Sequence, residues 1–224
     1  MKNSFIILFV SAITLTVIAC LPAFSSSTLS GQALWSKNTP KTIYLTFDDG
    51  PDPINTPIFL DILKKYNVKA TFFVLGRKAE KNPAIIKRIK DEGHILGNHT
   101  FNHIDGTVKS KKTIERDLER THNIIRQACG VNVTLFRPPY GYFDWRVYNA
   151  ASDRGYQIVL WTFDVCDWEV YDPKEYLKTV NENLSDGAII LLHDGGPSRE
   201  ALIEALPQII EQIKAKGFQF KNDI

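Results

Sequence analysis

Short apolar runs alternate with amphipathic segments along most of the chain. Runs rich in β-branched, aromatic and aliphatic residues predict buried strands. Between these runs, apolar residues recur three and four positions apart, as on one face of a helix. Strands are expected at residues 42–45, 70–74, 94–97, 133–136, 157–161, 188–192 and 218–220. Helices are expected at 56–66, from Asn82-Pro83 to Gly93, at 112–128, from Asp144 to before Gly155, from Asp172-Pro173 onward and around 202–213.

The alternation of strand and helix predicts the fold class. It is typical of an α/β protein with a parallel sheet, either open or closed into a barrel. The run 188–192 is wholly apolar, as expected for a strand that is buried on both faces. The pattern continues through residues 41–224, so we expect these residues to form one domain.

The composition fits a globular domain and indicates no nucleic-acid partner. The chain has 224 residues, of which 44% are hydrophobic, which is enough for one sizeable core. Its formal net charge is +2, and acidic and basic residues are interspersed, whereas nucleic-acid-binding domains carry clustered basic residues. We expect a monomer.

The first 20 residues differ from the rest and predict export. Lys2 is followed by an apolar run that reaches Ala19, the pattern of a secretory signal. Three outcomes are left open. Val17-Ile18-Ala19-Cys20 resembles the bacterial lipobox, in which the cysteine is lipidated after cleavage, and this outcome is favoured. Cleavage near Ala23 and an uncleaved membrane anchor are the alternatives.

The next segment and the remaining cysteines give weaker expectations. Residues 21–40 contain Ser, Gly, Asn and Pro with little periodicity, which predicts a linker. Within it, Trp35 is expected to pack on the edge of the domain. Cys129 and Cys166 could pair in an oxidising compartment, but two buried free thiols are the favoured interpretation.

Polar and charged residues gather where the predicted strands end. In parallel α/β folds the carboxyl ends of the strands share one rim, and active sites form there. The opposite rim shows no comparable cluster. The residues at this rim are Asp48, Asp49, His99, His103, Arg137, Asp164, Asp167, His193 and Asp194.

Asp48 and Asp49 are adjacent carboxylates at the point where the first strand becomes a turn. Gly50-Pro51 stops the strand, because proline lacks a donor and glycine frees the backbone. Two like charges so close are unfavourable unless a cation lies between them or one of them is protonated. The alternative is a turn whose carboxylates are solvated.

His99 and His103 add two imidazoles, four positions apart. On a helix this spacing would place both on one face, as metal binding requires. Together with Asp49 they form a two-histidine, one-carboxylate set, which Zn²⁺, Co²⁺, Ni²⁺, Mn²⁺ and Fe²⁺ all tolerate. The alternative is a pair of exposed surface histidines.

Three further segments carry groups that suit hydrolysis. Arg137-Pro138-Pro139-Tyr140 is a stiff turn that can aim a backbone N–H at developing negative charge. Asp164 and Asp167 could orient a histidine, and Trp168 could form a pocket wall. His193 directly follows a buried strand and is poorly placed to be solvated. The alternatives are a structural loop with Arg137 in an ordinary surface ion pair, a loop in which Asp164 and Asp167 cap helices, and a core histidine at position 193.

Five segments, in this order, resemble the motifs of the polysaccharide deacetylases, the NodB-homology enzymes also called carbohydrate esterase family 4. They are Thr46-Phe47-Asp48-Asp49-Gly50, His99-Thr100-x-x-His103, Arg137-x-Pro139-Tyr140, Asp164-x-x-Asp167-Trp168 and Leu191-x-His193. The resemblance covers residues 41–224. It implies a distorted (β/α) barrel of about seven strands and metal-dependent removal of N- or O-acetyl groups from sugars.

The resemblance also implies a metal site. Asp49, His99 and His103 would bind one divalent ion, with zinc expected first and cobalt, nickel, manganese or iron as alternatives. One departure is visible. Gly106 stands where relatives commonly carry leucine, which affects packing beneath the two histidines and not a ligand.

The remaining roles implied by the resemblance concern the reacting groups. Asp48 would be the general base and would be held by Arg137. The general acid would be His193, tuned by Asp167, and the backbone N–H of Tyr140 would stabilise the oxyanion. Trp168 and Leu191 would line the acetyl pocket.

These residues lead us to expect an exported N-acetylglucosamine deacetylase that acts on peptidoglycan or a chitin-like polymer. The residue types suit amide hydrolysis, which needs an activated water, charge stabilisation and a proton for the departing amine. An O-acetyl esterase of the acetylxylan type and a catalytically silent sugar-binding module are the alternatives.

Overall fold

The computed structural model describes residues 30–224. The predictions for the export segment 1–20, and for the linker as far as residue 29, lie outside these residues. Among the helices of residues 30–224, none is long and apolar enough to cross a bilayer.

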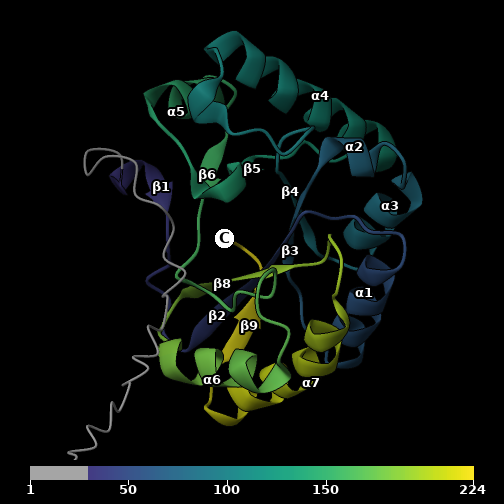
Figure 1. The fold of residues 1–224 in the computed structure, drawn as a ribbon, viewed down its shortest axis with the longest axis vertical. Coiled ribbons are helices and arrows are strands. Elements are labelled where there is room, and N and C mark those ends of the chain that lie inside the picture. The colour runs from purple at the N-terminus through teal and green to yellow at the C-terminus, as the bar shows by residue number, and fades with distance from the viewer. Residues whose placement is uncertain (1–29) are drawn as a thin grey trace, which may run out of the picture.

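The described residues form one curled sheet of nine strands, and its strand pairings are parallel (Figure 1). The strand order is β1-β6-β5-β4-β3-β2-β8-β7, and β9 also pairs with β2. The strands are β1 (Ala33–Leu34), β2 (Thr42–Asp48), β3 (Thr71–Val74), β4 (Ile95–Asn98), β5 (Leu135–Phe136), β6 (Gln157–Val159), β7 (Phe163–Asp164), β8 (Ala188–His193) and β9 (Gln219–Lys221).

The predicted α/β fold with a parallel sheet is thus confirmed, with differences in the short strands. All seven predicted strands are present, although β5 and β6 are shorter than expected. The two-residue strands β1 and β7 were not predicted. A two-residue strand is too short for an alternating pattern to mark it, so only pairing with a neighbour reveals it.

Helices lie around the outer side of the curled sheet (Figure 1). Two predicted N-termini are capped as the sequence suggests, because the side chains of Asp144 and Asp172 accept hydrogen bonds from backbone N–H groups of the first turn. Ser110, which the sequence did not mark, caps the helix predicted at 112–128 in the same way. Asn82 makes no such bond. The helices are α1 (Asn55–Lys65), α2 (Gly76–Ala79), α3 (Pro83–Asp91), α4 (Lys111–Cys129), α5 (Trp145–Ser152), α6 (Pro173–Asn183) and α7 (Glu200–Ala215).

Part of the segment predicted to be a linker belongs to the sheet. Ala33 and Leu34 pair with β6, and Ser36 makes an antiparallel bridge to Ala188 of β8. These two contacts join parts of the sheet that are distant along its strand order, so the curled sheet approaches a closed barrel. The prediction of a linker up to residue 40 is wrong here because Ala33, Leu34 and Trp35 pack against the core. The packing of Trp35 on the domain is as expected.

The alternation of side chains along β2 separates the core from the interior of the curled sheet. All seven residues of β2 are buried, but successive side chains point to opposite faces. Phe47 packs against Phe59 of α1, at a ring centroid distance of 5.3 Å, and so faces the helices. Thr46 and Asp48 therefore face the interior, where both contact Arg137.

The cysteine prediction is only partly correct. Cys129 is a free thiol and is half-buried, whereas Cys166 is disulfide-bonded. Cys129 and Cys166 therefore do not pair with each other, and the favoured interpretation of two buried free thiols is wrong for Cys166. The number of residues between two cysteines does not give the distance between their sulfur atoms, so the pairing could not be derived from the sequence.

Candidate active site

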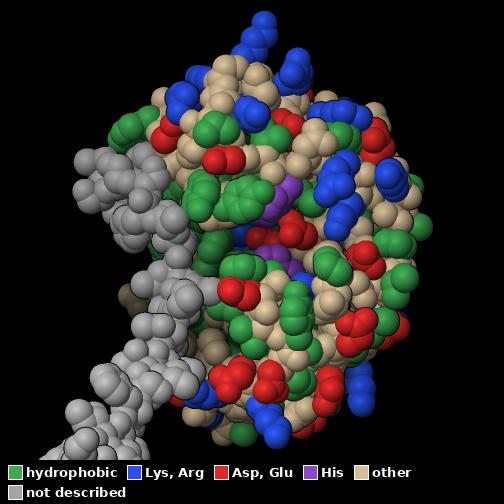
Figure 2. Space-filling model, viewed as in Figure 1, with side chains coloured by type: hydrophobic (Ala, Val, Ile, Leu, Met, Phe, Trp, Pro, Cys, Tyr) green, Lys and Arg blue, Asp and Glu red, His purple; other side chains and the backbone are tan. Residues whose placement is uncertain are grey.

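The rim residues predicted from the sequence do meet, in a hollow at the carboxyl ends of the strands. Asp48 of β2 and His193 of β8 are register partners, as are Thr46 and Leu191. Partners in adjacent parallel strands point to the same face, so these four side chains share the interior. Figure 2 shows the hollow, with histidine and acidic side chains on its floor and hydrophobic side chains along its border.

Asp49, His99 and His103 form a compact set of ligand atoms at this hollow. Their ligand atoms lie within 4.8 Å of one another. Asp49 Oδ1 lies 3.6 Å from His99 Nε2 and 3.3 Å from His103 Nε2. The same oxygen is buried and has no hydrogen-bond partner among the described residues. A buried carboxylate oxygen without a partner is unfavourable, and a cation between it and the two imidazole nitrogens would satisfy it.

The tautomer of His99 also fits a metal ion. Its Nδ1 lies 2.7 Å from the backbone oxygen of Arg137. A carbonyl oxygen can only accept, so Nδ1 carries the hydrogen and Nε2 presents its lone pair to the hollow. His99 is buried, which fixes this orientation.

The two histidines reach the site from a loop, and not from a helix as the spacing suggested. The backbone is in the left-handed region at Thr100 and at His103, with φ of 66° and 60°. Asn98, at the end of β4, accepts the Thr100 N–H through its side chain. This irregular turn brings both imidazoles toward Asp49, whose own φ is 69°.

The pKa shifts favour the forms that bind a cation. Burial by itself raises the pKa of Asp49, but the charges of His99, His193, His103 and Lys78 together lower it below its ordinary value. Burial lowers the pKa of His103, and the neighbouring His99 lowers it further. Asp49 is therefore ionised and His103 neutral near pH 7, as metal ligands must be.

Arg137 is wholly buried and holds Asp48 in place. Its Nη1 donates to Asp48 Oδ1 and to Thr46 Oγ1, each at 2.8 Å. The other guanidinium nitrogens donate to the backbone oxygens of Val159 and Leu160. Because burial disfavours its charge, the pKa of Arg137 is lowered, although Asp48 opposes this shift. The surface pair considered for this arginine is excluded.

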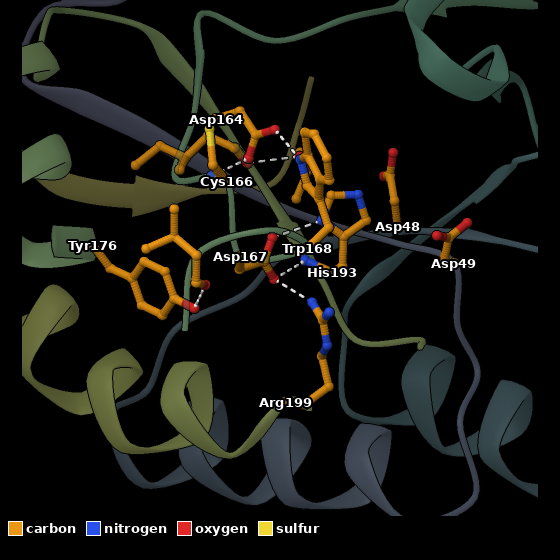
Figure 3. Close-up of polar contacts among 12 residues, drawn as sticks. Asp48, Asp49, Asp164, Cys166, Asp167, Trp168, Tyr176, His193 and Arg199 are labelled. Atoms are coloured by element: carbon orange, nitrogen blue, oxygen red, sulfur yellow. Dashed lines mark hydrogen bonds and ion pairs between the residues drawn. The ribbon is translucent and has the colours of Figure 1, made fainter. Parts of the chain in front are cut away.

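Asp167 holds His193 through both of its carboxylate oxygens (Figure 3). Oδ1 lies 2.7 Å from His193 Nδ1, and Oδ2 accepts the His193 backbone N–H at 2.9 Å. Burial by itself lowers the pKa of His193, but the charge and hydrogen bond of Asp167, with the charges of Asp164 and Asp48, raise it to about 10. His193 is therefore protonated at neutral pH and can donate from Nε2.

Asp164 has a different partner. Its Oδ2 accepts from Trp168 Nε1 at 2.9 Å, and its Oδ1 accepts from the Cys166 N–H at 2.8 Å. Burial raises the pKa of Asp164 to about 6. Asp164 thus holds the Trp168 ring in place, and Figure 3 shows this ring beside His193.

The predicted pocket residues lie around the same hollow. Trp168 is 49% exposed, whereas Leu191 is buried on the His193 face of β8. Tyr140 has φ of 62°, and its ring meets the His103 ring edge-on, with centroids 4.6 Å apart. The Tyr140 ring therefore lies next to the metal-ligand set.

Asp194, a further rim residue, supports the turn and does not enter the hollow. It is fully buried, accepts a hydrogen bond from Thr56, and donates its backbone N–H to the Asp48 oxygen at 3.1 Å. A Cβ on Gly50 would lie 2.1 Å from Asp194 Oδ2. The glycine after Asp49 is therefore required by this close approach.

Comparison with known proteins decides the family. The model of the polysaccharide deacetylase family matches residues 36–159. The chain is 38% identical over 194 residues to a peptidoglycan-N-acetylglucosamine deacetylase of Bacillus cereus, covering 85% of this chain and 91% of that protein. This chain belongs to the polysaccharide deacetylase family. The predicted resemblance is confirmed.

Two further relatives of the deacetylase family agree. A chitooligosaccharide deacetylase of Azorhizobium caulinodans is 34% identical over 200 residues, covering 84% of this chain and 95% of that protein. A crystal structure of a peptidoglycan N-acetylglucosamine deacetylase in complex with 4-naphthalen-1-yl-N-oxidanyl-benzamide has a TM-score of 0.84 and 34% identity, over 88% of this chain and 94% of that one. The predicted distorted barrel is therefore also the family's fold.

Sequence reasoning missed two residues that contact the site. Thr46 was quoted only as part of a motif, yet its hydroxyl accepts from Arg137. Arg199 was not singled out, although its Nη1 donates to Asp167 Oδ2 at 2.7 Å. Alternation along β2 would have placed Thr46 on the same face as Asp48. No pattern in the loop that holds Arg199 marks it.

Proposed function

We propose that this protein is a metal-dependent deacetylase that hydrolyses the N-acetyl groups of N-acetylglucosamine residues in peptidoglycan or a chitin-like polysaccharide. The observation that carries the proposal is the meeting of three groups in one hollow. These are a cation-binding set, a carboxylate held by a buried arginine, and a protonated histidine. The names of the similar deacetylases of Bacillus cereus and Azorhizobium caulinodans support both substrate classes.

The metal site would consist of Asp49 Oδ1, His99 Nε2 and His103 Nε2. Two imidazoles and one carboxylate suit several divalent ions, and we propose zinc first. When bound, the ion would polarise the acetyl carbonyl as a Lewis acid and make water a better nucleophile. The unpartnered Asp49 oxygen and the tautomer of His99 support this assignment.

Asp48 is proposed as the general base. Its Oδ1 is occupied by Arg137, while Oδ2 lies 3.7 Å from His99 Nε2, at the edge of the metal-ligand set. A water beside this set would lose a proton to Asp48 as its oxygen attacks the acetyl carbon. The backbone N–H of Tyr140 is proposed to donate to the oxygen that becomes negative.

His193 is proposed as the general acid. When the carbon–nitrogen bond breaks, the departing nitrogen takes a proton from His193 Nε2, and the products are acetate and a free amine on the sugar. The attacking water supplies the proton that Asp48 receives, so protons balance once Asp48 and His193 exchange one through solvent. Trp168 and Leu191 are proposed to border the acetyl group.

The proposed substrates place the enzyme outside the cytoplasm, at the cell wall. This agrees with the predicted export signal at residues 1–20. Lipidation at Cys20, cleavage near Ala23 and an uncleaved anchor all remain proposals for the N-terminus, as does the monomeric state.

Acetate release from defined polymers tests the proposal. Full-length protein would be incubated with peptidoglycan, chitin oligomers, poly-N-acetylglucosamine and acetylxylan, with and without Zn²⁺. We expect release from one or more of the three N-acetylated substrates, dependent on metal. Release only from acetylxylan would replace the proposal with an O-acetyl esterase. No release from any of them would favour the silent binding module.

A further inference from the structure

The Asp167 carboxylate takes part in three hydrogen bonds. Two of them are with His193 and the third is with Arg199. Oδ1 meets the imidazole and Oδ2 accepts the His193 backbone N–H. Oδ2 also accepts from Arg199 Nη1, at 2.7 Å. Figure 3 shows His193 beside Asp167 and Arg199 reaching the same carboxylate from below. Among the described residues, the hydrogen bonds and ion pair of Arg199 go to Pro197 and Asp167 and not to the metal-ligand set.

Arg199 is held in a conformation that serves this contact. It lies at the start of α7, after the loop that follows β8, and only 3% of its surface is exposed. The preceding Ser198 has φ of 58°, an uncommon conformation for serine. Arg199 Nε donates to the backbone oxygen of Pro197 at 3.0 Å, which fixes the guanidinium plane.

A buried ion pair needs a reason other than stability. Removing two charges from water costs about as much free energy as their attraction returns, so a buried arginine–carboxylate pair is weak evidence for stabilisation. The carboxylate here also holds the proposed proton donor. An effect of Arg199 on proton release is therefore the more specific explanation.

We propose that Arg199 is a positioning residue for the proton donor, which fixes the Asp167 carboxylate and offsets its charge so that His193 can release its proton to the departing amine. This inference rests on the proposed function. Without a positive partner, Asp167 attracts the His193 proton at full strength. The Asp167–His193 pair then keeps that proton to higher pH, and His193 is the weaker acid.

The other carboxylates around His193 act in the same direction as Asp167. Asp164 and Asp48 raise its pKa, and Asp49 also interacts with it. His103, whose own pKa is lowered in part by His193, opposes them only when it is protonated. Tyr176 of α6 interacts with both Asp167 and Arg199. Arg199 is thus the positive group that contacts Asp167 directly, among several carboxylates that favour retention of the proton.

The test compares Arg199→Gln and Arg199→Lys in the full-length, metal-loaded protein. For Arg199→Gln we expect kcat to fall roughly 10- to 100-fold, less than the 10²- to 10⁴-fold contribution of a positioned proton donor itself, while KM and metal content stay unchanged. The basic limb of the pH–rate profile should move up by about one unit. Arg199→Lys keeps the charge and should restore most of kcat and the original limb. Arg88→Gln is the matched control, because it removes the ion pairs of another arginine, to Asp61 and Glu92. It should leave kcat and the basic limb of the pH–rate profile unchanged.

A measurement independent of turnover separates this inference from the proposed function. The His193 imidazole can be titrated by nitrogen NMR, and its pKa should be higher in Arg199→Gln than in the parent protein. An unchanged or lower His193 pKa overturns the inference even if the enzyme is an active deacetylase. If Arg199→Gln does not fold, Arg199→Lys still decides, because a folded lysine variant with a tenfold loss of kcat would show that the charge is not what matters. A raised His193 pKa without any acetate release would show that Arg199 acts on His193 through Asp167, and would reject the deacetylase together with the departing amine as the acceptor of the proton.

Discussion

At the scale of single residues, the two adjacent aspartates have different partners. Asp48 completes β2 and is held by Arg137, whereas Asp49 lies one position later, with a positive φ, and faces His99 and His103. Asp48 accepts a hydrogen bond from the guanidinium of Arg137. Asp49 has a buried oxygen without a partner. Two neighbours of the same type therefore support two different roles.

Substitution of each aspartate should separate these roles. Asp49→Ala removes one of three metal ligands, so the metal content of the purified protein should fall sharply, and excess metal should restore part of the activity. Asp48→Asn keeps the shape but cannot accept a proton. It should retain metal and substrate binding while turnover falls at least about 100-fold at any metal concentration. Metal stoichiometry and acetate release decide, and loss of metal from Asp48→Asn alone would reverse the assignment.

The pH dependence should report the Asp167–His193 pair. The pKa of His193 is raised to about 10, so its acid form is present at neutral pH and is lost as pH rises through that value. Asp167→Asn removes the main cause of the shift, and the basic limb of the rate profile should then move to lower pH. His193→Ala should lower the rate by roughly 10²- to 10⁴-fold with little change in metal content. A basic limb that stays in place in Asp167→Asn would contradict the role of the pair.

The same pair links stability to pH. Because the pKa of His193 is higher in the folded protein than its ordinary value of 6.5, its contribution to the free energy of unfolding is complete below about pH 6.5. The contribution declines as pH rises toward about 10. Denaturant titrations of the parent protein and Asp167→Asn across this window should therefore converge at the alkaline end.

At the scale of elements, the turn after the two histidines is packed against α5. Gly106 is buried, and a Cβ added to it would lie 2.7 Å from Val147 Cγ2. The leucine that the family resemblance leads us to expect at this position would therefore need space that Val147 occupies. The departure predicted from the sequence to affect packing does so through α5, and no ligand is changed.

This contact gives a double-substitution test. Gly106→Leu should destabilise the protein by about 1–3 kcal/mol, the usual cost of overpacking, and Val147→Ala should also destabilise it, through a cavity. The two changes together should cost less than their sum, because the smaller side chain makes room for the larger one. Urea denaturation of the four proteins measures the coupling. Strict additivity would show that the two positions do not compete for space.

At the scale of the whole molecule, the N-terminal segment predicts how the protein is attached to the cell. The lipobox-like Val17-Ile18-Ala19-Cys20 follows an apolar run. Two or more lipid chains on one protein anchor it stably, whereas one chain alone gives marginal binding. Cys20→Ser expressed in a bacterial host should remain an unprocessed precursor. Mass spectrometry of the N-terminus would check this, and normal cleavage and release of the variant would favour the ordinary signal peptide.

The sequence by itself determined the type of fold and the chemistry of its rim. Hydrophobic runs and helical spacing predicted seven strands and six helices, since burial of apolar side chains imposes these periods wherever an element is long enough. Polar residues at strand ends predicted Asp48, Asp49 and His193 together, because parallel strands present their carboxyl ends on one side.

Only the tertiary structure decided how these groups are coupled. The loop geometry at His99 and His103 and the closure of the sheet by Ser36 depend on contacts between residues far apart in the chain. The same holds for the ion pair of Arg199 with Asp167. Local periodicity does not predict such contacts, because they are made between residues that only the folded chain brings together. The residues of the site could therefore be named from the sequence, while their hydrogen bonds and charges could not.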